Sequence, residues 1–187
     1  MENPTRVVTG KVRFSFCNVF TPVAVNAGET PKYSVCLLIP KTDTKTVDLI
    51  KKAIEAAKSE NKAKLADKMG RVPSNLKTPL RDGDEERPDA PEFAGMYFIN
   101  ANTHNQPGIV DRDRNPILAK EDFYPGCYGR ASINFFAYNV DRSKGIAAGL
   151  NNLQKLADGP HLSGGPSAEE DFGGENDWNG DEEDSLM

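Results

Sequence analysis

Cysteine and histidine are scarce in this sequence, which limits the sites that it can build. The three cysteines stand far apart, their number is odd, and no pair has C-x-x-C spacing. This arrangement argues against a disulfide framework and against a zinc site, and it favours a reducing cytoplasm. The two histidines, His104 in an asparagine-rich turn and His161 near the C-terminal segment, are not placed to form a metal centre together.

Long apolar runs and catalytic motifs are also missing. The first ten residues, MENPTRVVTG, lack the apolar centre of a signal peptide, and no stretch approaches the roughly 20 apolar residues that cross a bilayer. The sequence contains no G-x-S-x-G elbow, no phosphate loop ending in Gly-Lys-Ser/Thr and no H-E-x-x-H pair. We therefore expect neither a membrane protein nor an enzyme, and no cofactor or metal.

Basic residues are absent from the end of the chain, and this hides the charge of the rest. The whole chain has 28 acidic and 23 basic residues and a formal net charge of −5. Nine of the acidic residues lie between Ser167 and Met187, so residues 1–166 hold 19 acidic against 23 basic residues, about +4. A mildly basic body with an acidic extension is typical of a protein with a polyanionic partner.

The pattern of apolar residues predicts two strands and a helix in the first half. Residues 7–16 alternate between apolar and polar side chains, and residues 33–39 are β-branched and aromatic. Asp43 or Thr44 can cap a helix that Gly70 would end. In the first strand the apolar side is Val8, Val12, Phe14 and Phe16, and the other side is Thr9, Lys11, Arg13 and Ser15.

The second half begins with residues 71–94, whose prolines, glycine and charges predict a long surface loop. Residues 96–102 follow as a strand, and residues 108–119 as a hairpin with the tip DRDRNP. The clearest strand covers residues 128–140, and leucines spaced along residues 145–156 predict a short helix. In the strand the core-like set is Ala131, Ile133, Phe135 and Ala137, and the outer set is Arg130, Ser132, Asn134, Phe136 and Tyr138.

About five strands with one helix among them predict a mainly β protein with an OB-fold-like five-stranded barrel. A small β-sandwich with one helix fits nearly as well. Residues 1–158 would form this domain, because neither half of the chain could build a core alone. Residues 159–187, which are low in hydrophobic residues and rich in glycine and acid, would form a disordered acidic C-terminal tail.

Basic and aromatic side chains fall on the faces that the core does not use. Single-stranded nucleic acid is held by this combination, because cations follow the phosphates while aromatic rings stack on the bases. Residues just past the second strand and in the hairpin tip would grip phosphates at the groove edges. The expected DNA-binding residues are Lys11, Arg13, Lys41, Arg112, Arg114, Arg130, Phe136 and Tyr138.

The same residues could also serve different roles. Phe136 and Tyr138 could instead cover a second small core beneath the loop 71–94, and the charges could simply be solvated. Asp111 and Asp113 could hold Mg²⁺ in a nuclease, although arginines alternate with them and a turn explains the motif. An adaptor that binds a protein partner, with an acidic tail that mimics DNA, also fits the charge pattern.

Four segments carry a resemblance to a known family. They are GKVRFSFCNVFTP, YSVCLLIPKTD, FYPGCYGRASINFFAYN and GIAAGLNNLQKL, in this order. Together they resemble a family of bacteriophage single-stranded-DNA-binding proteins long catalogued as a domain of unknown function. The layout of residues 5–158 and the tail is also similar to the single-stranded-DNA-binding proteins of short-tailed phages, which have an OB fold and an acidic tail.

The resemblance implies a protein that coats single strands with little sequence preference during phage replication, recombination and repair, in the host cytoplasm. Duplex DNA as a weaker ligand and a homodimer stay open. The tail would compete with DNA for the basic groove and recruit replication proteins such as polymerase and helicase. Its expected partner-binding residues are Phe172, Trp178, Asp181, Glu182, Glu183, Asp184, Leu186 and Met187.

The end of the tail departs from the family pattern, because such tails often finish with an aromatic residue and this one ends Ser185-Leu186-Met187. An apolar anchor after the acidic run is retained, although the partner that it would meet is open. A role in solubility alone accounts for many acidic tails. Such a role has no use for Trp178, the single tryptophan of the chain.

Overall fold

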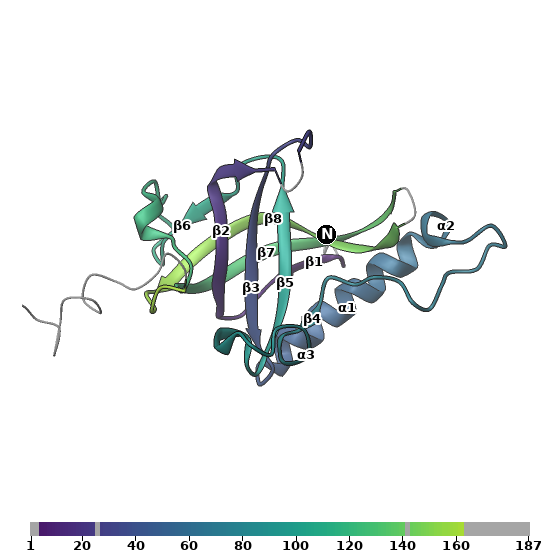
Figure 1. The fold of residues 1–187 in the computed structure, drawn as a ribbon, viewed down its shortest axis with the longest axis horizontal. Coiled ribbons are helices and arrows are strands. Elements are labelled where there is room, and N and C mark those ends of the chain that lie inside the picture. The colour runs from purple at the N-terminus through teal and green to yellow at the C-terminus, as the bar shows by residue number, and fades with distance from the viewer. Residues whose placement is uncertain (1–3, 25–26, 141–142, 163–187) are drawn as a thin grey trace, which may run out of the picture.

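Five strands close into a barrel in the computed structural model, which describes residues 4–24, 27–140 and 143–162 (Figure 1). Around the ring, β7 pairs with β2, β2 with β3, β3 with β5, β5 with β8, and β8 with β7. The β5–β8 pairing is parallel and the others are antiparallel. The strands are β1 (Arg6–Val8), β2 (Val12–Val23), β3 (Lys32–Pro40), β4 (Arg81–Asp82), β5 (Met96–Thr103), β6 (Gly108–Val110), β7 (Tyr128–Val140) and β8 (Ser143–Ala157).

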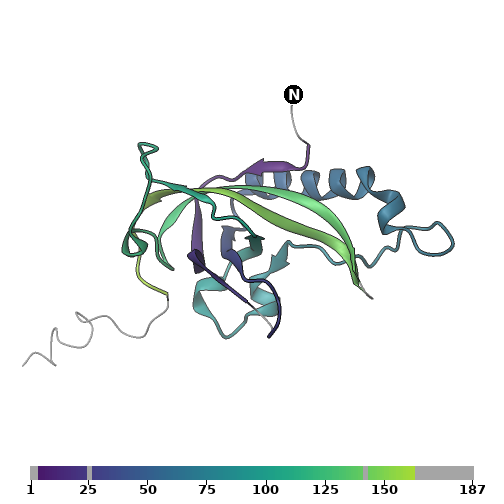
Figure 2. The same ribbon diagram turned by 90° about the horizontal axis from the view of Figure 1, so that it is seen from above.

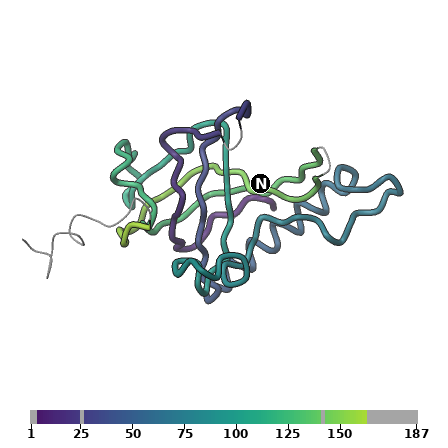
Figure 3. Tube along the Cα trace, in the orientation of Figure 1, coloured from purple at the N-terminus to yellow at the C-terminus, as the bar shows by residue number. Residues whose placement is uncertain are grey.

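This ring confirms the predicted mainly β fold and its OB-fold-like five-stranded barrel. In Figure 1, β2, β3 and β5 cross in front of β7 and β8. The chain trace shows β7 and β8 side by side as one long curved hairpin (Figure 3). The short strands β1, β4 and β6 pair with β7, β5 and β8, respectively, outside the ring.

The predicted helix is α1 (Thr44–Glu60), which runs beside the β7–β8 hairpin (Figure 2). The Asp43 side chain caps it by accepting a hydrogen bond from the Thr46 backbone N–H. The helix ends at Glu60, ten residues before Gly70, where the sequence predicted its end. Among the described residues, no helix is long and apolar enough to span a membrane. Shorter helices are α2 (Lys62–Leu65), α3 (Gly83–Glu86), η1 (Pro91–Phe93) and η2 (Lys120–Asp122).

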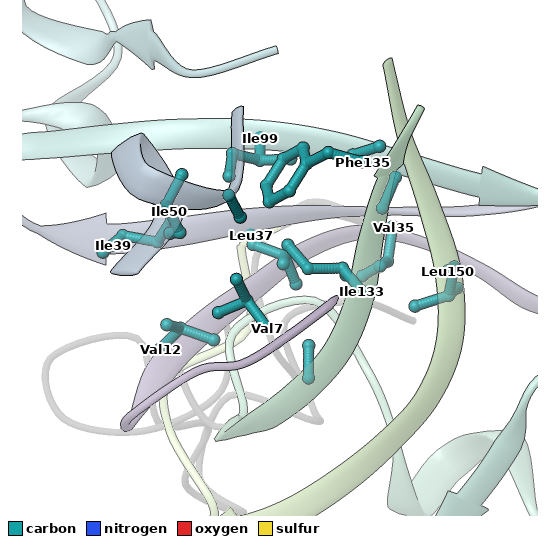
Figure 4. Close-up of a cluster of buried hydrophobic side chains, with 14 of the residues drawn as sticks. Val7, Val12, Val35, Leu37, Ile39, Ile50, Ile99, Ile133, Phe135 and Leu150 are labelled. Carbon is teal, nitrogen blue, oxygen red and sulfur yellow. The ribbon is translucent and has the colours of Figure 1, made fainter. Parts of the chain in front are cut away.

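The main core fills the barrel and extends to the buried face of α1. Ile50 of the helix, Leu37 of β3, Ile99 of β5 and Phe135 of β7 gather in this core, each at most 2% exposed (Figure 4). Because these residues come from four elements, the core ties the helix to the barrel. The core combines residues from both halves of the chain.

The predicted helix over residues 145–156 is wrong, because this segment is part of β8. Ser132 pairs with Asn152 while the next β7 residue, Ile133, pairs with Leu150. Asn151 is therefore an extra residue, a β-bulge that turns both Leu150 and Leu153 toward the core. The bulge gives a strand the three-residue leucine spacing that is typical of a helix.

The first predicted strand is interrupted twice. It breaks between β1 and β2, so Val7 and Thr9 are buried while Val8 is exposed. A second irregularity in β2 leaves Phe16 exposed, against the prediction that it lies on the core side with Phe14. The predicted alternation over residues 7–16 is therefore wrong at both ends. Of the four residues expected on the core side, Val12 and Phe14 are buried, but Val8 and Phe16 are exposed.

The predicted loop of residues 71–94 contains β4, α3 and η1, and it does cover a second small core. That core consists of Cys36, Leu38, Phe93 and Phe98, with Leu162 packed against it. Phe136 and Tyr138, which could have covered such a core, are not among its members. The hairpin of residues 108–119 forms through a bridge between Val110 and Pro116.

Candidate nucleic-acid interface

The five barrel strands contain no aspartate or glutamate. Acidic residues lie instead in the helices, in the connecting segments and at the end of the short strand β4, for example Asp84 in α3 and Asp82 in β4. A strand surface without carboxylates does not repel a polyanion, and each basic side chain on it attracts one. The basic residues of these strands are Arg13, Lys32, Arg130, Lys144 and Lys155.

One end of β7 carries a basic cluster around Tyr128, which we define as Lys11, Arg13, Arg130 and this tyrosine. The Lys11 ammonium and the Arg13 guanidinium lie 5.1 Å and 5.4 Å from the centre of the Tyr128 ring. Arg13 pairs directly with Tyr128 across β2 and β7, so the two side chains share a face. Arg130 lies two residues further along that face, and its Nε donates to the Thr9 carbonyl oxygen at 2.8 Å.

The hairpin tip that follows β6 lies at the same end of the sheet. Gln154 of β8 pairs with Arg130, and its Nε2 donates to the carbonyl oxygens of Asp111 at 3.4 Å and of Arg112 at 3.3 Å. Neighbouring strands are about 4.8 Å apart, so the tip is only two strands, about 10 Å, from Arg130. The exposed Arg112 and Arg114 can therefore extend the basic cluster.

The Asp111 side chain of the tip has a structural role. The Asp111 carboxylate accepts hydrogen bonds from the backbone N–H groups of Asp113 and Asn115, both at 2.9 Å. These bonds hold the turn in which Arg114 has a positive φ of 69°. Among the described residues, no group of three or more acidic, histidine or cysteine side chains could hold a metal ion.

The other end of β7 carries an aromatic pair, Phe136 and Tyr138, above small residues of β8. Phe136 pairs with Ala147 and is 42% exposed, and Tyr138 pairs with Gly145. A Cβ atom at Gly149 would come within 3.5 Å of the Phe136 ring, and one at Gly145 would clash with the Lys77 carbonyl oxygen. The Phe136 ring is thus exposed, whereas Lys77 fills the space above Gly145, next to Tyr138.

A cavity of about 650 Å³ opens beside Tyr138 of this aromatic pair. Residues 77–81 form one wall, and Tyr138, Ala147 and Asn100 line the other side. Asn100 projects from β5 with an exposed side chain that can both donate and accept hydrogen bonds. The sequence pattern places it outward on the strand 96–102, but only the structure brings it next to Tyr138.

Lys41, which was expected at the groove edge, forms salt bridges with two carboxylates. Its Nζ lies 2.7 Å from Asp82 Oδ1 and 2.8 Å from Asp84 Oδ2. These hydrogen bonds raise the pKa of Lys41 and lower the pKa of both carboxyl groups. The positive charge of Lys41 is thus compensated locally, and the structure does not bring it into the basic cluster.

The basic cluster and the aromatic pair lie on one side of β7 and are joined by polar residues. Arg130 and Phe136 are six residues apart, about 20 Å along the strand. Between them lie Ser132, whose Oγ accepts a hydrogen bond from Arg6 Nε at 3.3 Å, and Asn134. Arg6 was not expected in the site, because only the β1–β7 pairing places it beside this face.

The chain has clear relatives among phage proteins. The family described as "Enterobacter phage Enc34, ssDNA-binding protein" matches residues 5–186. The chain belongs to this Enc34 family. It is also 31% identical over 166 residues to "Putative protein p50" of Acyrthosiphon pisum secondary endosymbiont phage 1, a match that covers 86% of this chain and 88% of the relative.

Solved structures of similar proteins agree with this membership in the Enc34 family. The single-stranded DNA-binding protein from bacteriophage Enc34, in complex with single-stranded DNA, has a TM-score of 0.74 and 27% identity, over 85% of this chain and 90% of that chain. A structure of the same phage protein with a C-terminal truncation has a TM-score of 0.71 and 25% identity, covering 84% and 88%. Gp2.5 of bacteriophage T7 shares the fold, with a TM-score of 0.58, 15% identity and coverage of 87% and 97%.

Residues 158–162, which we call the strap, lie against the barrel, although residues from 159 onward were expected in the disordered tail. Arg13 Nη2 donates to the Pro160 carbonyl oxygen at 2.7 Å, and the His161 ring stacks on Tyr124 with centroids 4.1 Å apart. The Leu162 N–H donates to the Pro125 carbonyl oxygen at 2.9 Å. The strap therefore ends beside the basic cluster.

The predicted partner-binding residues of the tail, from Phe172 to Met187, lie outside the described residues. The Enc34 family match nevertheless continues to residue 186, so it includes most of the acidic segment. The strap holds the last described residues of the chain against the barrel. Hydrogen bonds from Lys155 and from the Tyr124 hydroxyl hold Asp158 and lower the pKa of its carboxyl group.

Proposed function

We propose that this protein binds single-stranded DNA with little sequence preference, through the outer face of β7 and its neighbours, as a non-enzymatic binding protein. The observation that carries the proposal is a barrel whose five strands lack every carboxylate while they display basic side chains, the exposed Phe136 and the half-buried Tyr138. Membership of the Enc34 family supports it. In the infected cell the protein would coat strands exposed during replication, recombination and repair, in the host cytoplasm.

The two ends of β7 would contribute differently to binding. The basic cluster, with Arg112 and Arg114, meets phosphates and releases their counterions, so its contribution falls as salt rises. Phe136 and Tyr138 stack on bases, which every base allows because each has a π face. Affinity then comes from charge and stacking together, and sequence preference is low because neither interaction reads a base edge.

Replacing Phe136 by Ala should weaken binding to a single-stranded oligonucleotide by roughly tenfold, because one stacked base is worth about 1–3 kcal/mol. Tyr138→Ala should have a similar effect. The measurement is a fluorescence-anisotropy titration at fixed salt, with Phe136→Leu as the control that keeps an apolar side chain but loses the ring. Phe136→Leu should bind as weakly as Phe136→Ala.

Equal affinity of the wild type and both alanine variants would remove the aromatic pair from the interface. Absence of oligonucleotide binding by the wild type at moderate salt would instead refute the proposed function. It would favour an adaptor that binds a protein partner. Cleavage of the oligonucleotide with magnesium would point to a nuclease, and the titration should be run with that check.

We also propose that the acidic tail competes with DNA for the basic cluster. The strap holds the chain at Arg13, so the acidic tail is tethered to the barrel next to that cluster. A flexible segment of about 25 residues spans roughly 28 Å, which is enough to reach along β7. Tethering gives the tail a millimolar effective concentration, and DNA with its denser charge would displace it.

Truncation after Leu162 should tighten binding to single strands several-fold at low salt, because the competitor is lost while the strap is kept. The difference should vanish at high salt, where both charge interactions are screened. A full-length control with all acidic residues after Ser167 changed to Asn or Gln should behave like the truncation. Affinity unaffected by either change would exclude competition.

The displaced tail would then recruit replication proteins such as polymerase and helicase. Its apolar residues, Phe172, Trp178, Leu186 and Met187, would enter a pocket of the partner, while the acidic run Asp181–Asp184 steers the encounter. Replacing Trp178 by Ala should reduce partner capture without changing affinity for DNA. This outcome would separate recruitment from competition.

A further inference from the structure

Phe16 adopts a backbone conformation that a phenylalanine rarely accepts. Its φ is +47°, and among the described residues the only other non-glycine residue with positive φ is Arg114, which sits in a turn. In the left-handed region the Cβ atom crowds the backbone, which is tolerated in turns and is unusual for a bulky residue within a strand. Strain of this kind persists where the surrounding structure imposes it, and it concentrates at functional sites.

A β-bulge in β2 produces this conformation. Ser15 pairs with Cys36 and Asn18 pairs with Ser34, so three steps along β2 match two steps along β3. Regular alternation would place Phe16 on the core side with Phe14. With the bulge, Cys17 packs against the main core and Phe16 is 55% exposed. The strained residue thus carries an aromatic ring out of the core and into solvent.

The surroundings of the ring are suited to DNA. Neither β2 nor β3 contains an acidic residue, and Arg13 of the basic cluster lies three residues before Phe16, about 10 Å along the strand. Within the described part of the chain, Phe16 has no stacking partner and no cation over its ring. The Phe16 ring is therefore accessible near an arginine of the basic cluster.

We propose that Phe16 is a second nucleobase-stacking site, on the exposed surface of β2 and separate from the aromatic pair on β7. The inference rests on the proposed function and adds a second contact surface to it. A strand that meets the basic cluster at Arg13 can place one base on Phe16 while its neighbours continue along β7. The bulge holds the ring in place before DNA arrives, at a cost in stability.

Replacing Phe16 by Gly tests this, because affinity for DNA should then fall without a loss of stability. Glycine accepts a positive φ without strain and removes the ring, so the melting temperature should stay equal or rise by about 2 °C. Affinity for a single-stranded oligonucleotide should fall about tenfold. Phe16→Trp should retain wild-type affinity, and Val23→Ala, at another exposed apolar residue of β2, should bind normally.

A matched ligand isolates the stacking interaction. On an oligonucleotide of the same length built from abasic nucleotides, the wild type and Phe16→Gly should bind equally, because no base can stack. A fall in melting temperature for Phe16→Gly, or wild-type affinity for the normal oligonucleotide, would overturn the inference. If the wild type binds the normal oligonucleotide and Phe16→Gly binds it equally well, only the Phe16 site is refuted. If the wild type does not bind it, the proposed function itself is refuted.

Discussion

Changing Lys11 and Arg130 together to glutamate is expected to weaken binding to single-stranded DNA about 1000-fold at roughly 50 mM salt. Both side chains are exposed and belong to the basic cluster around Tyr128, where each can meet a phosphate. Each charge reversal removes one attractive contact with a phosphate and adds one carboxylate that repels it. Arg13 is left unchanged, because its bonds to Gly126 and Pro160 also hold the strap.

The salt dependence identifies the cause of this loss. The slope of log affinity against log salt should become shallower by about 0.7 for each cation that is removed from the interface. Near 1 M salt, the affinities of the variant and the wild type should converge. A loss that is independent of salt would mean that the substitutions disturb the fold, and the basic cluster would then not be the phosphate-binding surface.

A variant with the same change in net charge supplies the control. Lys45 and Lys52 are exposed on α1 and belong to the helix surface that faces solvent. Lys45→Glu with Lys52→Glu lowers the net charge equally but changes no residue of the proposed interface. Its affinity should fall only slightly, through the long-range field of the protein. An equal loss in both variants would mean that net charge alone governs binding.

The sequence predicted the barrel because its strands are long and strongly patterned. Residues 128–140 alternate in the sequence, and the structure confirms that strand and its buried set, although Ser132 of the expected outer set is buried at 8% exposure. The failures lie at bulges, where one extra residue changes which side chains face the core. Asn151 makes part of β8 resemble a helix, and the bulge at Phe16 reverses the expected side of an aromatic residue. Single-sequence periodicity cannot locate such an insertion.

The candidate site was predictable where it depends on alternation along one strand, and less so where it depends on pairing. Arg130 and Phe136 follow from the pattern of β7 alone. The approach of Gln154 and the hairpin tip to Arg130, and of Arg6 to Ser132, requires the register between strands. The two carboxylate partners of Lys41 also depend on tertiary contacts, and an isolated basic residue in the sequence gives no sign of them.

Phe14 and Phe16 lie two residues apart and should respond oppositely to substitution. The Phe14 side chain is 0% exposed and its ring centre lies 4.8 Å from that of Phe123. Phe14→Ala leaves a cavity where β2 meets β7, and should lower the free energy of unfolding by about 4 kcal/mol and the melting temperature by about 12 °C. Thermal denaturation checks this, with Phe14→Leu as the milder, cavity-reducing control.

DNA affinity provides the second half of this comparison. Measured well below its melting temperature, Phe14→Ala should bind single strands nearly as the wild type does, because the side chain lies inside the barrel and cannot meet a base. Phe16→Gly should show the reverse, with stability kept and affinity lost. If Phe14→Ala melts like the wild type, the barrel is not closed around Phe14, and the register that places Arg13 beside Tyr128 would be wrong as well.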